Sequence, residues 1–220
     1  MSSVRSVVLT TAAILGIAIS AFSQGMMRPP HVPGEFKPVV GSGGEYQMTM
    51  KDDKTQAFAM AVVGKETVEG QEAYWLEWRM DSQRGKILMK QLMLVQPGNT
   101  AVKRMIVQTP GRPPMEMPIG MMGMGMQHEH EMETQAGGHG MGEMVGSESV
   151  TVPAGSFDAQ HFRSTDNGRT ADVWASAKVS PYGLVKMTSS DGSGMILQKV
   201  LDHESSQITG EPQKIPGMTH

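Results

Sequence analysis

The sequence of 220 residues contains no cysteine, and only 5% of its residues are aromatic. The lack of cysteine excludes disulfides, thiolate-ligated zinc, cysteine-bound iron–sulfur clusters and thiol nucleophiles. Neither sign of charge is in large excess, because the formal net charge is only −3. The sequence therefore gives no electrostatic reason to expect a nucleic-acid partner. The fold must therefore depend on an apolar core that uses few aromatic rings and no covalent cross-links.

Long hydrophobic runs are missing too. The one apolar stretch, Val7–Ile19, is shorter than the ~20 residues that span a bilayer and follows the positively charged Arg5. The small residues Ala21 and Ser23 stand where a signal peptidase reads the chain. We expect residues 1–23 to be a cleavable signal peptide and the product to be periplasmic or extracellular. After cleavage it should not span the membrane, and without cysteine it has no residue to carry a lipid.

The remaining chain divides by composition. Residues 24–44 are rich in proline and glycine and are predicted to form a flexible arm. Residues 45–204 are predicted to form a single β domain, with a disordered insertion at 110–147. The polar residues 205–220 are expected to form a flexible tail.

Short alternating segments separated by turn residues fill the predicted domain. In the clearest of them, the apolar residues face one side and the charged residues face the other, which is typical of a β-strand. The apolar residues are Tyr74, Leu76, Trp78 and Met80, and the charged residues are Glu77, Arg79 and Asp81. Residues 86–95 fit either a short helix or a strand. The spacing predicts an all-β fold (or a β-rich α+β fold), built as a curved antiparallel sheet or half-barrel with a long Met/His-rich loop.

That loop carries the densest chemistry of the chain. Nine of the 22 methionines and three of the seven histidines lie between residues 115 and 144. Thioethers are ligands for Cu(I), and imidazoles for Cu(II) and zinc. In an extended backbone His128 and His130 project to the same side. We expect copper-like metal to bind at His128, His130, His139, Met121, Met122, Met124 and Met126. The alternative is a low-complexity insertion without a metal.

Three other constellations are weaker. His161 and His203 would form an acid–base or metal pair only if their strands were neighbours. Ser193 lies between two glycines, but the flanking residues do not complete a nucleophile-elbow motif. The tryptophans, Trp75, Trp78 and Trp174, either line a cavity for an apolar ligand or belong to the core.

One pattern resembles a known family. The segment 152–158 (Val-Pro-Ala-Gly-Ser-Phe-Asp), then Trp174, then the segment 181–187 (Pro-Tyr-Gly-Leu-Val-Lys-Met), is similar to exported bacterial domains of unknown function. These domains are related in shape to the LolA-like lipoprotein-carrier half-barrels. The resemblance covers about 40 residues. It implies an antiparallel sheet curled around an apolar interior and carries no site residue over to this chain.

The sequence thus predicts an exported binding protein that is not an enzyme. Its ligand would be either copper-like metal at the Met/His-rich loop, or a lipid or other hydrophobic molecule in the concave face of the sheet. No protein partner is indicated.

Overall fold

The computed structural model describes residues 32–96, 99–118, 141–166 and 168–214. They form one curved sheet of twelve strands, and no helix occurs in these ranges. The strands are β1 (Gly43–Thr49), β2 (Thr55–Val68), β3 (Gln71–Ser82), β4 (Gly85–Gln96), β5 (Asn99–Gln108), β6 (Met115–Met117), β7 (Glu143–Val152), β8 (Gly155–Asp166), β9 (Arg169–Ala175), β10 (Leu184–Ser189), β11 (Gly194–Leu201) and β12 (Gln213–Lys214). The all-β, antiparallel prediction is confirmed.

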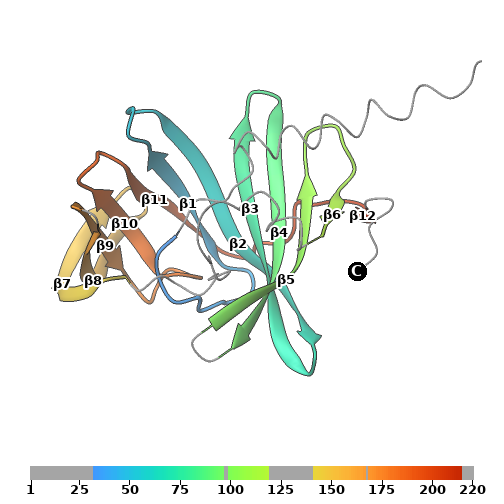
Figure 1. Ribbon diagram of the computed structural model, residues 1–220, viewed down its shortest axis with the longest axis horizontal. Coiled ribbons are helices and arrows are strands. Elements are labelled where there is room, and N and C mark those ends of the chain that lie inside the picture. The colour runs from blue at the N-terminus through green and yellow to red at the C-terminus, as the bar shows by residue number, and fades with distance from the viewer. Residues whose placement is uncertain (1–31, 97–98, 119–140, 167, 215–220) are drawn as a thin grey trace, which may run out of the picture. The chain divides into compact units, whose positions relative to one another are not determined.

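The strand order across the sheet is β12-β6-β5-β4-β3-β2-β1-β11-β10-β9-β8-β7. Neighbouring strands are antiparallel, except that β12 runs parallel to β6. Sequential hairpins therefore build two halves, β1–β6 and β7–β11, and β1 joins them by pairing with both β2 and β11. Figure 1 shows β6 and β12 at one end of the sheet and β7 with β8 at the other.

The second half of the sheet is strongly rolled. Strand β7 comes within 8 Å of β10 and β11, measured between Cα atoms, although β8 and β9 lie between them in the hydrogen-bonded order. With strands about 4.8 Å apart, a flat sheet would separate β7 from β11 by about 19 Å. The side chains that β7, β8 and β9 place on one face are therefore brought together.

Residues 86–95, which fit two structures in the sequence, lie in strand β4. Their neighbours decide the outcome, because β4 pairs with β3 on one side and β5 on the other. Both faces of β4 are buried, so its apolar residues do not alternate with polar ones. A strand buried on both faces lacks the period-2 pattern that would distinguish it from a buried helix segment.

The predicted flexible arm differs from the structure in its described part. Val32 and Phe36 are buried, and the Phe36 ring lies 5.4 Å from the ring of Tyr182. The backbone N–H of Lys37 donates to the carbonyl of Pro181 at 2.7 Å. Proline and glycine predict an extended backbone, but burial of two apolar side chains fixes that backbone against the sheet.

The described part of the predicted flexible tail, 205–214, also differs from expectation. It runs from the end of β11 to β12 at the far edge of the sheet. On the way Ser206 Oγ and the backbone N–H of Gln207 donate to Glu77, at 2.6 and 2.9 Å. The contacts of residues 205–207 with the sheet are hydrogen bonds to the polar side chains of Glu77 and Arg79, and the hydropathy of the segment does not predict such contacts.

The predicted insertion at 110–147 is occupied by strand at both ends. Strand β6 forms at 115–117, and β7 begins at Glu143. Residues 119–140 lie outside the described residues.

In the part of the chain that the structure describes, no helix has the length and apolarity that crossing a membrane requires.

Candidate functional site

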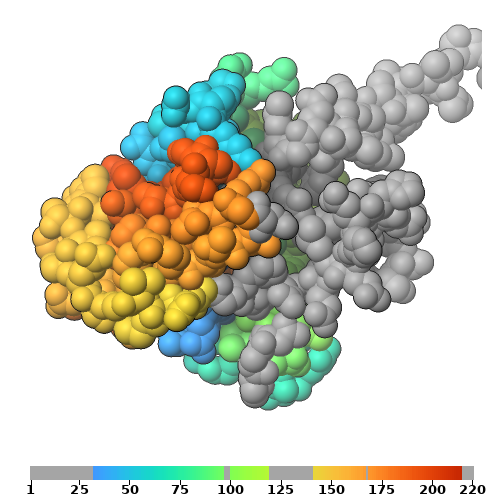
Figure 2. Space-filling model, turned by 60° about the vertical axis from the view of Figure 1, so that its left-hand side comes forward, coloured from blue at the N-terminus to red at the C-terminus, as the bar shows by residue number. Residues whose placement is uncertain are grey.

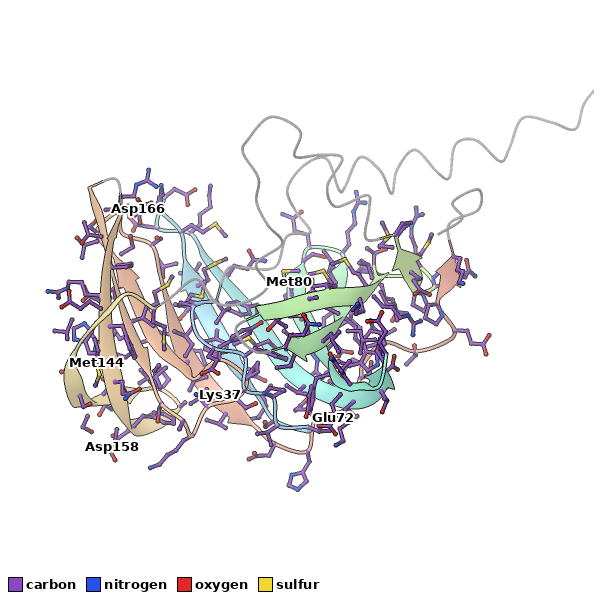
Figure 3. The ribbon with its side chains drawn as sticks, turned by 60° about the horizontal axis from the view of Figure 1, so that its bottom comes forward. Lys37, Glu72, Met80, Met144, Asp158 and Asp166 are labelled. Atoms are coloured by element: carbon purple, nitrogen blue, oxygen red, sulfur yellow. The ribbon has the colours of Figure 1, made fainter. Side chains whose placement is uncertain are left out.

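The strand register sorts the methionines onto a single face of the sheet. Tyr46 lies opposite both Phe58 and Leu197, and Met60 lies opposite Trp78. Following this register across every strand places all eleven methionines of the described strands on the same side: Met48, Met60, Met80, Met89, Met93, Met105, Met115, Met117, Met144, Met187 and Met195. We call this side the methionine face. It extends over both halves of the sheet, as Met80 and Met144 show in Figure 3.

The opposite face of the same strands has an apolar core of different composition. Leu88, Leu92, Leu94 and Ile106 are buried there with small alanines. No methionine of the described strands is among them. The thioethers of the described strands are thus confined to one face, which they share with buried residues such as Leu76 and Leu197, and their side chains are flexible and polarisable.

A ladder of three aromatic rings runs across the methionine face from β1 to β3. Tyr46 stacks on Phe58 with ring centroids 5.2 Å apart, and Phe58 lies 6.0 Å from Trp78. The Tyr46 hydroxyl donates to the carbonyl of Leu184 at 3.0 Å, and burial raises the pKa of this phenol above its ordinary value. Tyr46 therefore stays neutral and links β1 to β10.

Trp78 differs from Tyr46 in this ladder because its polar atom has no hydrogen-bond partner among the described residues. Its side chain is 3% exposed, and no described residue accepts a hydrogen bond from its indole Nε1–H. Met60 and Met89 lie directly opposite it on the two neighbouring strands. A buried donor without an acceptor costs about 1–3 kcal/mol, so Trp78 marks a point on the face where an acceptor oxygen would be favourable.

The accessibility of the methionine face varies along it. Met60, Met89 and Met105 are at most 2% exposed, whereas Met144 is 51% exposed. Figure 2 shows the β7 and β8 region at the surface.

A separate open pocket has a volume of about 380 Å³ and is lined by Lys37, Pro38, Val39, Glu72, Tyr74 and Val95. Of these residues, Tyr74 belongs to the methionine face by its register with Met93.

A charged cluster occupies the opposite face of β7–β10. The His161 ring stacks on Trp174 with centroids 4.5 Å apart, and Lys186 Nζ lies 4.9 Å from the Trp174 ring centroid. Asp172 Oδ1 is 2.7 Å from His161 Nε2, and Glu148 Oε1 is 3.4 Å from His161 Nδ1. Because the carboxylates meet opposite ring nitrogens, they cannot share one metal ion with that imidazole. Both nitrogens of the histidine have a carboxylate partner, and His161 and Lys186, from the two strands that flank Trp174, both contact its ring. The cluster therefore links β7, β8, β9 and β10.

The acid dependence of this cluster is testable at Asp172. Burial raises its pKa, but hydrogen bonds from Arg163 and His161 outweigh burial and hold the pKa below its ordinary value. The ionised Asp172 carboxylate therefore stabilises the folded state fully above the pKa of about 3.9 that an aspartate has in the unfolded chain. This stabilisation is lost as the pH falls through the lower pKa of the folded state. NMR titration of the Asp172 carboxyl should show its pKa rising toward the ordinary value in Arg163→Met. An unchanged pKa would contradict the assignment.

The structure separates the two histidines that the sequence suggested as a pair. His161 lies in β8 and His203 follows β11, and β9 and β10 lie between these strands. Ser193 donates its hydroxyl to Asp191 Oδ1 at 2.6 Å within a turn, not to a histidine. The tryptophans also separate: Trp78 is on the methionine face, Trp174 is in the charged cluster, and Trp75 lies near Lys90 and Arg104.

The predicted metal ligands (His128, His130, His139, Met121, Met122, Met124 and Met126) lie outside the described residues, so this site stays a prediction. Among the residues that are described, no group of three or more His, Asp or Glu side chains is arranged to hold a metal ion. The methionine face was missed in the sequence because it depends on register. Its local signals were short alternations such as those of Tyr46 and Met48, of Phe58 and Met60, and of Trp78 and Met80, and none of them shows that the strands share a face.

Comparisons with known proteins assign no family. No protein-family model matches the chain, and none of the curated proteins matches it significantly. Among solved structures, it is similar to a provisionally described lipoprotein of Parabacteroides distasonis, with 13% identity, a TM-score of 0.38, and 77% of this chain and 100% of the other covered. It is also similar to a provisionally described exported protein with a YmcC-like fold from Bacteroides fragilis, with 10% identity, a TM-score of 0.36, and coverages of 77% and 99%. Neither description mentions a lipoprotein carrier of the LolA type, and that resemblance stays a prediction.

Proposed function

We propose that this chain is an exported binding protein without enzymatic activity, and that the methionine face takes an apolar ligand. The observation that carries the proposal is the sorting of all eleven methionines of the described strands onto one face. Methionine has three rotatable bonds and a polarisable sulfur, so a surface built from it adapts to ligands of varied shape.

The class of ligand follows from Trp78. An apolar molecule that inserted beside the aromatic ladder, whose three rings are at most 4% exposed, would contact Phe58 and the thioethers of Met60 and Met89. An oxygen acceptor in that molecule would take the unpaired indole N–H. Small-molecule sites in proteins combine such apolar walls with a few placed polar groups. We therefore propose a ligand with an acyl or similar chain that carries a carbonyl, ester or carboxyl oxygen.

The proposal can be tested by tryptophan quenching with a nitroxide-labelled stearic acid. The variant Trp75→Phe with Trp174→Phe leaves Trp78 as the sole tryptophan, and its fluorescence should be quenched in a saturable way. The matched variant Trp78→Phe keeps Trp75 and Trp174, which lie off the methionine face, and its fluorescence should be unchanged. Equal quenching in both variants, or none in either, would refute binding at this face.

A further inference from the structure

We infer that Met105, Met115 and Met117 form a three-thioether site for a soft monovalent cation such as Cu(I). This goes beyond the apolar-ligand function, and it uses residues separate from the predicted Met/His-rich loop site. Across β5 and β6, Met105 lies directly opposite Met117, and Val107 lies opposite Met115. Opposite side chains on antiparallel strands have Cβ atoms about 5 Å apart, and diagonal neighbours are about 7–8 Å apart. The three sulfurs are therefore within reach of one ion.

The composition of β6 supports this reading. The strand is only Met-Glu-Met, so the side that it gives to the methionine face consists of thioethers alone. Its central Glu116 points to the opposite face, where it pairs with Arg104 at 2.8 Å between Oε1 and Nε. The carboxylate is thereby removed from the site, and a set of neutral sulfur donors is left, which suits Cu(I) better than a hard divalent cation.

The surroundings admit a cation. On the methionine face the next side chains on β4 and β5 are Gln91, opposite Met105, and Val107, and neither carries a positive charge. Met105 is 2% exposed, whereas Met115 and Met117 are half-buried. An ion can therefore enter past the two methionines of β6 and lie against the buried one. Three rotatable bonds in each side chain allow the sulfurs to converge.

Silver ion is the probe, because Ag(I) is also soft and monovalent and does not require exclusion of air. The full chain, labelled with carbon-13 at its methionine methyl groups, is titrated with Ag(I) and followed by NMR. The titration is run near pH 5, where imidazoles with a pKa of about 6.5 are protonated and do not ligate, so that neutral thioethers are observed alone. The methyl resonances of Met105, Met115 and Met117 should shift together with one saturation curve.

Met117→Leu should weaken Ag(I) binding at this site by more than about tenfold, since it removes one of three ligands. Leucine conserves the volume of methionine, so the fold should persist. The control Met80→Leu changes a methionine of the same face outside the trio and should leave the three shifts intact. The inference is wrong if Ag(I) saturates the protein while these three resonances do not move, or if Met80→Leu abolishes the shifts as Met117→Leu does. Neither result bears on the stearic-acid test.

Discussion

Replacing Arg79 by methionine should lower the free energy of unfolding by about 3–5 kcal/mol, because it leaves a buried carboxylate without its cation. Glu77 is fully buried and Arg79 is 6% exposed, and Arg79 Nε lies 3.0 Å from Glu77 Oε1. The same guanidinium pairs with Glu204 and donates to the carbonyl of Ser205 at 2.9 Å. The substitution thus also releases the C-terminal segment from the sheet. Urea unfolding monitored by circular dichroism measures the change.

The control is Arg163→Met, which also breaks an arginine–carboxylate contact on this sheet. Arg163 is 52% exposed at its side chain and pairs with Asp172 at 2.8 Å, so its loss should cost only about 0–1 kcal/mol. Similar losses in the free energy of unfolding for the two variants would show that the Glu77–Arg79 pair does not hold the C-terminal segment 205–214 against the sheet. Hydrogen exchange should in addition show faster exchange of the Gln207 amide, which donates to Glu77, in Arg79→Met alone.

Replacing Gly43 by alanine should destabilise the protein by about 3 kcal/mol, at the upper end of the cost of overpacking. A Cβ at this position would lie 2.1 Å from the carbonyl oxygen of Met60 and 2.7 Å from the Cα of Ala61. Both atoms belong to the backbone of β2, so no side chain can rotate away. Because β1 joins the two halves of the sheet, the clash should weaken pairing at the junction.

Gly64→Ala is the matched substitution in a neighbouring strand. There the nearest atom to the added Cβ is the Cδ1 atom of Trp75 at 3.9 Å, which is an ordinary contact. We expect Gly64→Ala to be neutral or slightly stabilising, because glycine in a strand is entropically unfavourable. Thermal unfolding of the two variants measures the difference, and equal melting temperatures would show that β1 and β2 are not as closely paired as the structure has them.

Local sequence predicted the strands whose two faces differ. The alternation from Tyr74 to Met80 gave β3, because a strand with side chains of different polarity on its faces repeats every two residues. Even there the interpretation was incomplete, since the polar side of β3 is not solvated: Glu77 and Arg79 are buried under the C-terminal segment. The polar side of β3 is buried by a segment more than 120 residues away in the sequence, and no local sequence pattern predicts that contact.

The candidate site was predicted less well than the fold. The sequence drew attention to methionine in the Met/His-rich loop, where the residues are adjacent. It could not show that Met105 and Met117, or Met60 and Trp78, lie directly opposite one another. A register shift of one residue would move every side chain of a strand to the other face, and the register here is set by hairpin turns and by bulges such as that at Val62/Gly64.

The sequence by itself determined that this is a cysteine-free β protein rich in thioethers, because composition and period-2 alternation are properties of short stretches of chain. Only the tertiary structure decided that these thioethers share one face, that Trp78 is buried there without an acceptor among the described residues, and that a polar tail covers Glu77. The reason is physical: which face a side chain joins, and what then covers it, is fixed by pairing between strands distant in sequence.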